Sequence, residues 1–167
     1  MTRERVDSSG AELEVPLAEQ GEVARQFLVG VLERVGTAGT VEVREIDQST
    51  VEVAITGKDL AFLVGARGST VDALQDLARV VVQRRTGARR GRLLVDVAGY
   101  RQRRRQALAA FTLERAEEVL RDGVEQVLEP MGAADRKVIH DTANSVDGVR
   151  THSEGEDPRR RVVISPS

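Results

Sequence analysis

The sequence has no cysteine and very few aromatic residues, with one tyrosine, three phenylalanines and no tryptophan among 167 residues. The absence of cysteine excludes a disulfide framework and a thiolate metal site, and it fits a reducing compartment. No apolar run approaches the length of a transmembrane helix, and the N-terminus lacks the apolar segment of a signal peptide. We therefore expect a cytoplasmic protein that does not insert into a membrane, with a core of valine, leucine, isoleucine and alanine.

The motifs of common catalytic sites are also missing. The sequence contains no Gly-x-x-x-x-Gly-Lys-Ser/Thr segment to hold a nucleotide, and no nucleophile and histidine at a spacing that supports hydrolysis. Two histidines without cysteine argue against a zinc site. The acidic residues Glu154, Glu156 and Asp157 leave a metal-dependent nuclease as an alternative, although solvated charge in a turn explains them better. We expect no enzyme activity, no catalytic residue, no metal and no cofactor.

Positive and negative charges are segregated along the chain. The whole sequence carries 25 basic and 27 acidic residues, yet residues 61–105 hold eleven arginines against three aspartates. A basic block inside an acidic chain is the pattern expected of a protein that binds a polyanion such as a nucleic acid. A solvated arginine face on a helix is the alternative explanation of the same block.

Hydrophobic periodicity organises the first hundred residues. Residues 1–17 show no sustained period and predict a disordered acidic tail. Apolar residues at helical spacing predict helices, alternating residues predict strands, and the break at Glu45–Ile46 predicts a bulge or an early strand end. In the helix over residues 69–85, the predicted buried stripe is Val71, Leu74, Leu77, Ala78 and Val81. The expected order is helix 24–35, strands 41–44 and 51–56, helix 60–64, helix 69–85 and strand 92–97.

A four-residue elbow, Gly65-Ala66-Arg67-Gly68, joins two of these helices. Ser69 with Asp72 three positions later is typical of the capping box that opens a helix. The glycines let the backbone approach a ligand, the helix opens with free N–H groups, and Arg67 projects from the tip. These features suit a phosphate of a nucleic acid strand. Taken alone, a glycine-capped helix beside a serine-initiated helix is the commoner explanation of such a pattern.

The element order, together with Val64-Gly65-Ala66-Arg67-Gly68, resembles a KH domain in its type II, bacterial arrangement. The resemblance implies an α+β domain over residues 18–99 in which the elbow and a variable loop, here Thr86–Gly91, clamp about four nucleotides of a single strand. It also implies an apolar groove floor near Ile55, Leu63 and Val64. The residues implied to contact RNA in this half are Gly65, Ala66, Arg67, Gly68, Ser69, Arg89 and Arg90.

The second half, residues 100–167, is predicted to be a small α/β domain. Arg101 and Arg104 continue the basic block at the start of its first helix, and Arg136 and His140 share one face of a later helix because they stand four residues apart. The alternative explanation of that pair is a surface arginine beside a solvated histidine with no binding role. The first helix has the predicted stripe Ala109, Leu113, Ala116 and Leu120. The expected elements are helix 100–121, a weak strand at 124–129, helix 133–144 and strands 148–152 and 160–164.

The Arg-x-x-x-His pair, with Leu128-Glu129-Pro130-Met131 before it and Ser153-Glu154-Gly155-Glu156 after it, resembles the R3H domain. A KH domain followed by an R3H domain resembles the bacterial Jag family of SpoIIIJ-associated proteins, also called KhpB. The resemblance implies binding of single-stranded RNA, or of single-stranded DNA, at both domains, with Arg136 and His140 among the contacts. It further implies a post-transcriptional regulator or RNA chaperone linked to cell envelope growth and division. The implied protein partner is a small KH-only protein or a second copy of the chain, and a protein–protein adaptor remains an alternative function.

Overall fold

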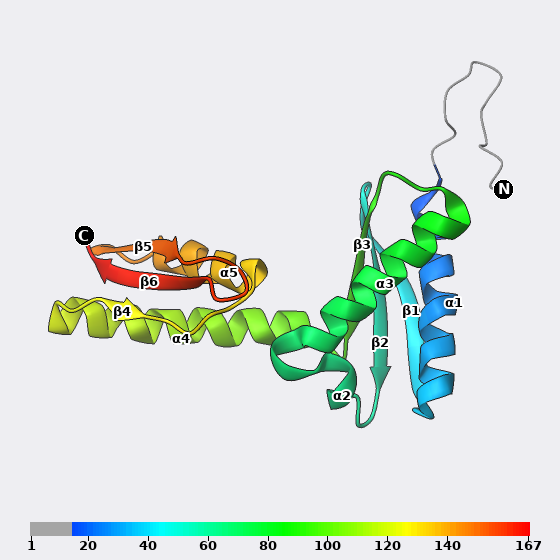
Figure 1. Cartoon of the computed structure of the whole chain (residues 1–167), viewed down its shortest axis with the longest axis horizontal. Helices are drawn as coiled ribbons and strands as arrows, with labels where there is room; N and C mark the ends of the chain where they lie inside the picture. The colour runs from blue at the N-terminus through cyan, green and yellow to red at the C-terminus, as the bar shows by residue number, and fades with distance from the viewer. Residues whose placement is uncertain (1–14) are drawn as a thin grey trace, which may run out of the picture. The chain divides into compact units, whose positions relative to one another are not determined.

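The structure, a computed structural model, describes residues 15–167 and divides into two compact units (Figure 1). The first unit ends at Tyr100, and the second runs from Arg101 to Ser167. The predicted acidic tail lies outside the described residues except for its last three positions, 15–17. Of these, Leu17 is already the first residue of helix α1 (Leu17–Val35).

The first unit contains a three-stranded mixed sheet, whose central strand is β2 (Thr50–Gly57). The strands β1 (Gly39–Asp47) and β2 (Thr50–Gly57) pair antiparallel, and β3 (Arg92–Val97) pairs with β2 in parallel. The register shifts between Glu45 and Asp47, which confirms the predicted bulge. The remaining elements are α2 (Ala61–Val64), the short 3-10 helix η1 (Ala66–Gly68) and α3 (Ser69–Thr86).

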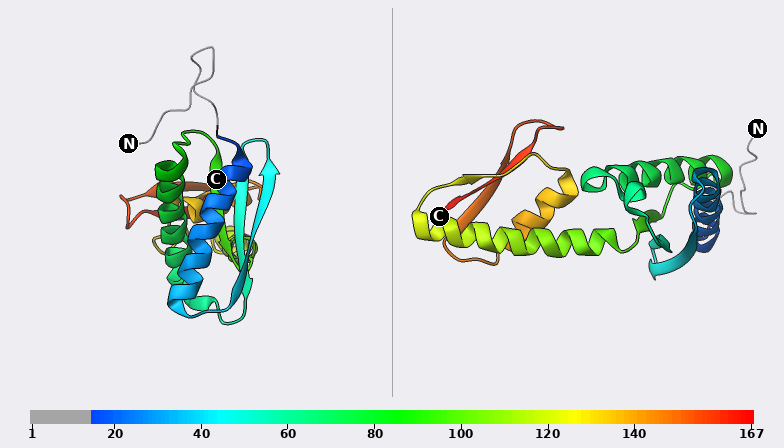
Figure 2. Two further views of the ribbon diagram at one scale, coloured as in Figure 1. Left: turned by 90° about the vertical axis from the view of Figure 1, so that its right-hand side faces the viewer. Right: turned by 90° about the horizontal axis from the view of Figure 1, so that it is seen from below.

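Helices α1 and α3 lie side by side on one face of this sheet (Figure 2). The alternate strand residues Val51, Val53 and Ile55 point into the core with Val95 and Val97 of β3. This alternation is what a sheet with one covered face requires. The core therefore fixes the orientation of α3, and with it the two loops at the ends of that helix.

The buried stripe of α3 differs from the prediction at three positions. Leu77 has 54% of its surface exposed, Val81 is only partly buried, and Val82, which was not expected in the core, is buried. The prediction followed the most apolar residues, whereas the buried face of the helix consists of Val71, Leu74, Ala78 and Val82. These four positions keep the spacing of three and four residues of one helical face.

The second unit is a sheet of three antiparallel strands in the order β4-β6-β5, with helices α4 and α5 sharing its core. Ile139 of α5 and Ile164 of β6 lie in this core, as do Leu108 and Val119 of α4. The elements are α4 (Tyr100–Asp122), β4 (Gln126–Val127), α5 (Ala133–Ala143), β5 (Val149–Glu154) and β6 (Arg161–Pro166).

Of the predicted stripe of α4, Ala116 is buried and the two leucines are wrong. Leu113 and Leu120 are 43% and 46% exposed, and the other buried positions are Leu108, Thr112 and Val119. The threonine can occupy the core because its hydroxyl donates to the Leu108 carbonyl at 2.7 Å, which satisfies its hydrogen-bonding group inside the helix.

Candidate nucleic-acid interface

The elbow between α2 and α3 has an unusual backbone. Gly65 has φ +74°, Arg67 has φ +54° and Gly68 has φ +88°, so three of its four residues lie in the left-handed half of the backbone map. The Gly68 N–H donates to the Gly65 carbonyl at 3.3 Å, which closes the turn. Ser69 has helical angles and is the first residue of α3, so the predicted capping box is wrong: the N-cap is Gly68.

Neither glycine of the elbow has room for a side chain. A Cβ atom on Gly65 would collide with the Thr70 hydroxyl and would lie 2.8 Å from the Thr70 backbone nitrogen. A Cβ atom on Gly68 would lie 2.7 Å from Cε1 of Tyr100. The elbow is therefore defined by close packing as well as by its backbone angles.

Tyr100 is a supporting residue that the sequence analysis missed. Its ring packs beside Gly68 and against the core of the first unit. The available signal was that Tyr100 is the single tyrosine of the chain and directly precedes a run of arginines.

Between these packed glycines, the tip of the elbow faces solvent. Ala66 and Arg67 are exposed, whereas Gly68 is buried. The 18-residue helix α3 follows directly. The N–H of its first residue, Ser69, donates to the Ala66 carbonyl, and the next N–H groups of its first turn have no intrahelical acceptor. The elbow thus offers N–H donors, a positive helix end and a guanidinium to one anionic group.

The predicted groove floor is largely inside the protein. Ile55 and Leu63 are 1% and 3% exposed and belong to the core, and only Val64 is partly exposed. The exposed large apolar side chains on the described surface of α2 and α3 are Phe62, Leu77 and Val80.

Arg89 and Arg90 lie at the other end of α3 from the elbow. Helix α3 has 18 residues, and a rise of about 1.5 Å per residue separates its ends by about 27 Å. The structure therefore does not bring the elbow and the loop Thr86–Gly91 together. Instead, Arg89 and Arg90 border a pocket of about 430 Å³ with Arg79 and Arg92.

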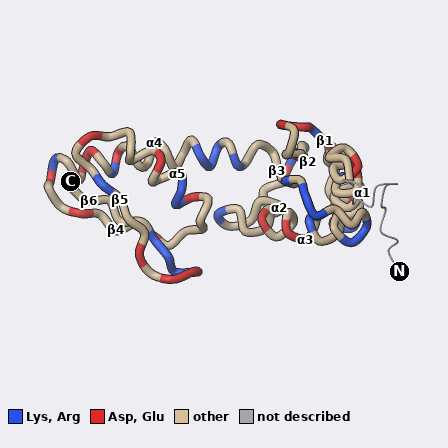
Figure 3. The backbone as a smooth tube through the Cα atoms, turned by 90° about the horizontal axis from the view of Figure 1, so that it is seen from above, with Lys and Arg blue, Asp and Glu red and all other residues tan. Residues whose placement is uncertain are grey.

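Arginines at the start of α4 are prominent in the second unit (Figure 3). Arg103 and Arg105 are exposed and Arg101 is partly exposed. Arg104 has a structural partner: its Nε and Nη2 atoms donate to Oδ2 of Asp135 at 3.1 and 2.8 Å, which ties α4 to the first turn of α5.

Arg136 is buried, with only 8% of its surface exposed. Its Nη1 atom donates to the Met131 carbonyl at 2.7 Å and to Oδ1 of Asp157 at 2.9 Å. The guanidinium thus joins the segment before α5 to the turn between β5 and β6. In this position it holds two loops rather than extending into solvent.

His140 lies one turn further along α5, and both of its ring nitrogens have partners. Nδ1 is 2.7 Å from the Thr151 hydroxyl and Nε2 is 2.8 Å from the Ser153 hydroxyl. Burial lowers the pKa of His140 below its ordinary value of 6.5, and the positive charge of Arg136 acts in the same direction. The neutral imidazole donates to one hydroxyl and accepts from the other, which fixes α5 to β5.

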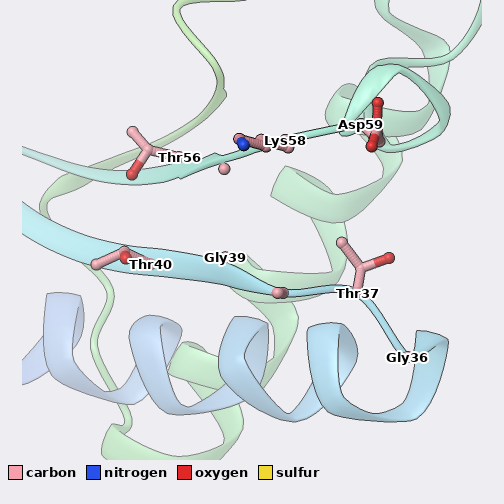
Figure 4. A pocket seen from close by; sticks show the side chains of 9 residues that line it. Gly36, Thr37, Gly39, Thr40, Thr56, Lys58 and Asp59 are labelled. Atoms are coloured by element: carbon pink, nitrogen blue, oxygen red, sulfur yellow. The ribbon is translucent and has the colours of Figure 1, made fainter.

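A second pocket of the first unit was not predicted (Figure 4). It has a volume of about 600 Å³ and lies where α1 leads into β1 and β2 leads towards α2. Lys58 and Asp59 bring opposite charges to it, and threonine hydroxyls and glycine backbone form much of the remainder. This mixed lining favours neither an anion nor a cation.

Residues 15–167 lack two features that would point to other functions. No described helix combines the length and the apolar character needed to cross a membrane. No group of three or more histidine, cysteine or acidic side chains is arranged there to hold a metal ion.

Comparison with known proteins matches the R3H domain model to residues 106–166. The chain is 34% identical to RNA-binding protein KhpB of Bacillus subtilis over 144 residues, which cover 85% of this chain and 68% of the relative. It is 34% identical to RNA-binding protein KhpB of Lactiplantibacillus plantarum, over 83% of this chain and 42% of that protein. The protein of the same name from Clostridium symbiosum is 33% identical over 85% of this chain and 64% of its own length. The chain thus spans between 42% and 68% of the length of these three relatives.

Proposed function

Because the chain belongs to the KhpB family, whose members compared here are named RNA-binding proteins, we propose that it binds single-stranded RNA. The proposal assigns a type II KH domain to residues 18–99 and an R3H domain to residues 100–167. The observation that carries it is the elbow, where two packed glycines expose Ala66 and Arg67 directly before the first turn of α3.

At the elbow, the bound group is a phosphate of the RNA backbone. The N–H groups that open α3 donate to the phosphate oxygens, and the Arg67 guanidinium adds a charge-assisted contact. The glycines keep the backbone free of side chains, so the sugar-phosphate chain can approach it closely. Contacts of this kind position a strand without reading its bases.

In the second unit, the exposed arginines of α4 supply further positive charge, while Arg136 and His140 act as positioning residues. Arg136 would have to leave Met131 and Asp157 to reach a phosphate, and His140 would have to leave two hydroxyls. Breaking such buried contacts is costly. Their role is to hold the β5–β6 turn and α5 in the shape that presents the surface.

Base specificity should be modest because the chain has few aromatic side chains to stack on bases. Guanidinium planes of exposed arginines can stack on bases in their place. We extend the proposal to a cytoplasmic post-transcriptional regulator or RNA chaperone linked to cell envelope growth and division. Single-stranded DNA is a further ligand, and a small KH-only protein or a second copy of the chain is the proposed protein partner.

The test is an exchange of charge at the tip of the elbow. The double variant Ala66→Asp/Arg67→Asp changes two exposed positions, and aspartate tolerates the positive φ of residue 67 better than most residues. A matched control is Arg34→Gln, which removes an exposed arginine of α1 in the same unit. We expect at least a tenfold loss of affinity for an oligoribonucleotide in the double variant and a change within about twofold in the control.

Equal affinities of the wild type and the double variant, with unchanged thermal unfolding, would contradict this site. Incubating labelled RNA with the protein and Mg²⁺ separates a binder from the alternative nuclease, because only the nuclease shortens the RNA. Crosslinking in cells, followed by separate recovery of RNA and protein, tests the alternative that the chain is a protein–protein adaptor. An adaptor would be recovered with protein alone.

A further inference from the structure

The sheet of the first unit has two outer strands, β1 and β3, and side chains of α3 protect the edge of β3 (Figure 1). The Val95 N–H donates to Oε1 of Gln75 at 3.1 Å, and Nη2 of Arg79 donates to the Leu93 carbonyl at 3.4 Å. Both backbone groups point away from β2, because successive residues of a strand point to opposite sides and the Arg92 N–H points to the β2 side. A further strand therefore finds the edge of β3 already occupied.

The outer edge of β1 has no such protection. In the part of the chain that the structure describes, no other strand pairs with this edge, and no side chain forms a hydrogen bond with the backbone of residues 40–46. The strand also contains neither proline nor lysine, which commonly block sheet edges. The bulge between Glu45 and Asp47 ends its regular part, so Val41–Glu45 can accept a further strand.

The charges of β1 are self-complementary about Val43. Glu42 and Arg44 are half exposed on the face of the sheet that the helices leave uncovered, because they alternate with the core-facing Val41 and Val43. Antiparallel pairing of two copies centred on Val43 sets Glu42 opposite Arg44 of the second copy, twice by symmetry. Pairing centred on Glu42 or on Arg44 instead sets a like charge against itself. The charge pattern therefore favours one register.

We propose that β1 is a homodimer interface, in which it pairs antiparallel with β1 of a second copy about Val43. The inference specifies the second-copy partner of the proposed function, and it does not depend on RNA binding. A two-fold axis perpendicular to the sheet joins the two three-stranded sheets into one of six strands, with both copies of α1 on the same face. The Glu42–Arg44 ion pair within each chain, at 2.6 Å, then becomes part of a cluster of four alternating charges.

The experiment uses two charge-reversal variants of the full chain, Glu42→Arg and Arg44→Glu. Each variant alone sets two pairs of like charges opposite each other, whereas a one-to-one mixture of the two sets opposite charges at both places. The matched control variants are Lys137→Glu and Asp141→Arg, which reverse the charges of an exposed ion pair of α5 in the second unit. Sedimentation equilibrium gives the dimer dissociation constant of each protein and of each mixture.

We expect each β1 variant to raise the dissociation constant of the dimer at least about tenfold, and the mixture to restore it to within about threefold of the wild type. The control variants, alone and mixed, should match the wild type. A wild type that stays monomeric at about 1 mM would overturn the inference, as would β1 variants that dimerise like the wild type. A mixture that dimerises no better than its two components would overturn it as well, because weakening alone can come from damage to the fold.

Hydrogen exchange of the wild type supplies a measurement that needs no variant. Amides in peptides of Gly39–Asp47 should exchange more slowly above the dimer dissociation constant than below it, while peptides of β3 stay unchanged. Slowing confined to other surfaces would overturn the β1 interface. If the wild type binds an oligoribonucleotide but forms no dimer through β1, this inference alone fails. If it dimerises through β1 and binds no oligoribonucleotide, the proposed RNA-binding function alone fails.

Discussion

Arg136→Ala should destabilise the second unit rather than remove an RNA contact. The buried guanidinium donates to the Met131 carbonyl at 2.7 Å and to Asp157 at 2.9 Å. Losing a charge-assisted hydrogen bond to the partly buried Met131 carbonyl costs about 2 kcal/mol, and losing the packed aliphatic stem costs about 1 kcal/mol. The carboxylate of Asp157 is 68% exposed, so its share is small, about 0.5 kcal/mol. We expect the free energy of unfolding to fall by about 3.5 kcal/mol.

Hydrogen exchange measured by mass spectrometry of the full chain tests this value. A loss of about 3.5 kcal/mol corresponds to roughly 400-fold faster exchange in peptides of α5 and β6, with peptides of the first unit unchanged. Asp157→Asn is the matched variant: it keeps an oxygen acceptor and removes only the charge, so exchange should rise less than about threefold. If Arg136→Ala keeps the native exchange pattern yet loses RNA affinity, Arg136 is a direct contact and the reasoning is refuted.

Three further predictions concern the salt dependence of binding, the pH dependence of stability and the packing at Gly68. Binding of RNA should weaken with salt along a slope near −3.5 if about five phosphates are neutralised, and a slope near zero would remove the electrostatic basis of binding. Because burial lowers the pKa of His140 in the folded protein, the same histidine binds a proton more readily in the unfolded chain. The free energy of unfolding should therefore fall as the pH drops below about 6.5. Urea unfolding of His140→Gln should show a weaker pH dependence than that of the wild type. Gly68→Ala should lower the free energy of unfolding by at least about 1 kcal/mol more than Gly87→Ala, because both glycines have positive φ but only a Cβ on Gly68 would meet a ring, at 2.7 Å. Equal losses of stability in thermal unfolding would show that the Tyr100 ring can move aside at no cost.

Periodicity identified the elements well and their buried faces less well. The bulge near Glu45 was read from a local break in alternation, which is a local property of one strand. The face of α4 depends on strands that follow tens of residues later, and the helix has apolar residues on two sides, such as Leu108 and Leu113. Its core includes Thr112, whose polarity is satisfied by the helix itself. A stripe drawn from apolar residues alone therefore included two leucines that are exposed.

The candidate site was predictable where the signal was local. Gly65 and Gly68 imply a sharp turn, and both have positive φ. Tyr100 was not predictable as the wall behind Gly68, because it stands 32 positions away and no pattern links the two residues. The four-arginine pocket was missed for the same reason: Arg79 and Arg92 converge with Arg89 and Arg90 only once β3 pairs with β2.

The spacing of Arg136 and His140 correctly put both side chains on one face of a helix, but it could not say what that face meets. Charged side chains are exposed by default, so solvent and RNA were the natural expectation. The structure turns that face towards Asp157, Thr151 and Ser153. Packed and exposed residues have separate roles at the elbow as well, where the glycines set the geometry and an exposed arginine supplies the charge. Substitutions of the packed residues should therefore act first on stability, whereas substitutions of exposed arginines should act first on the salt dependence of binding.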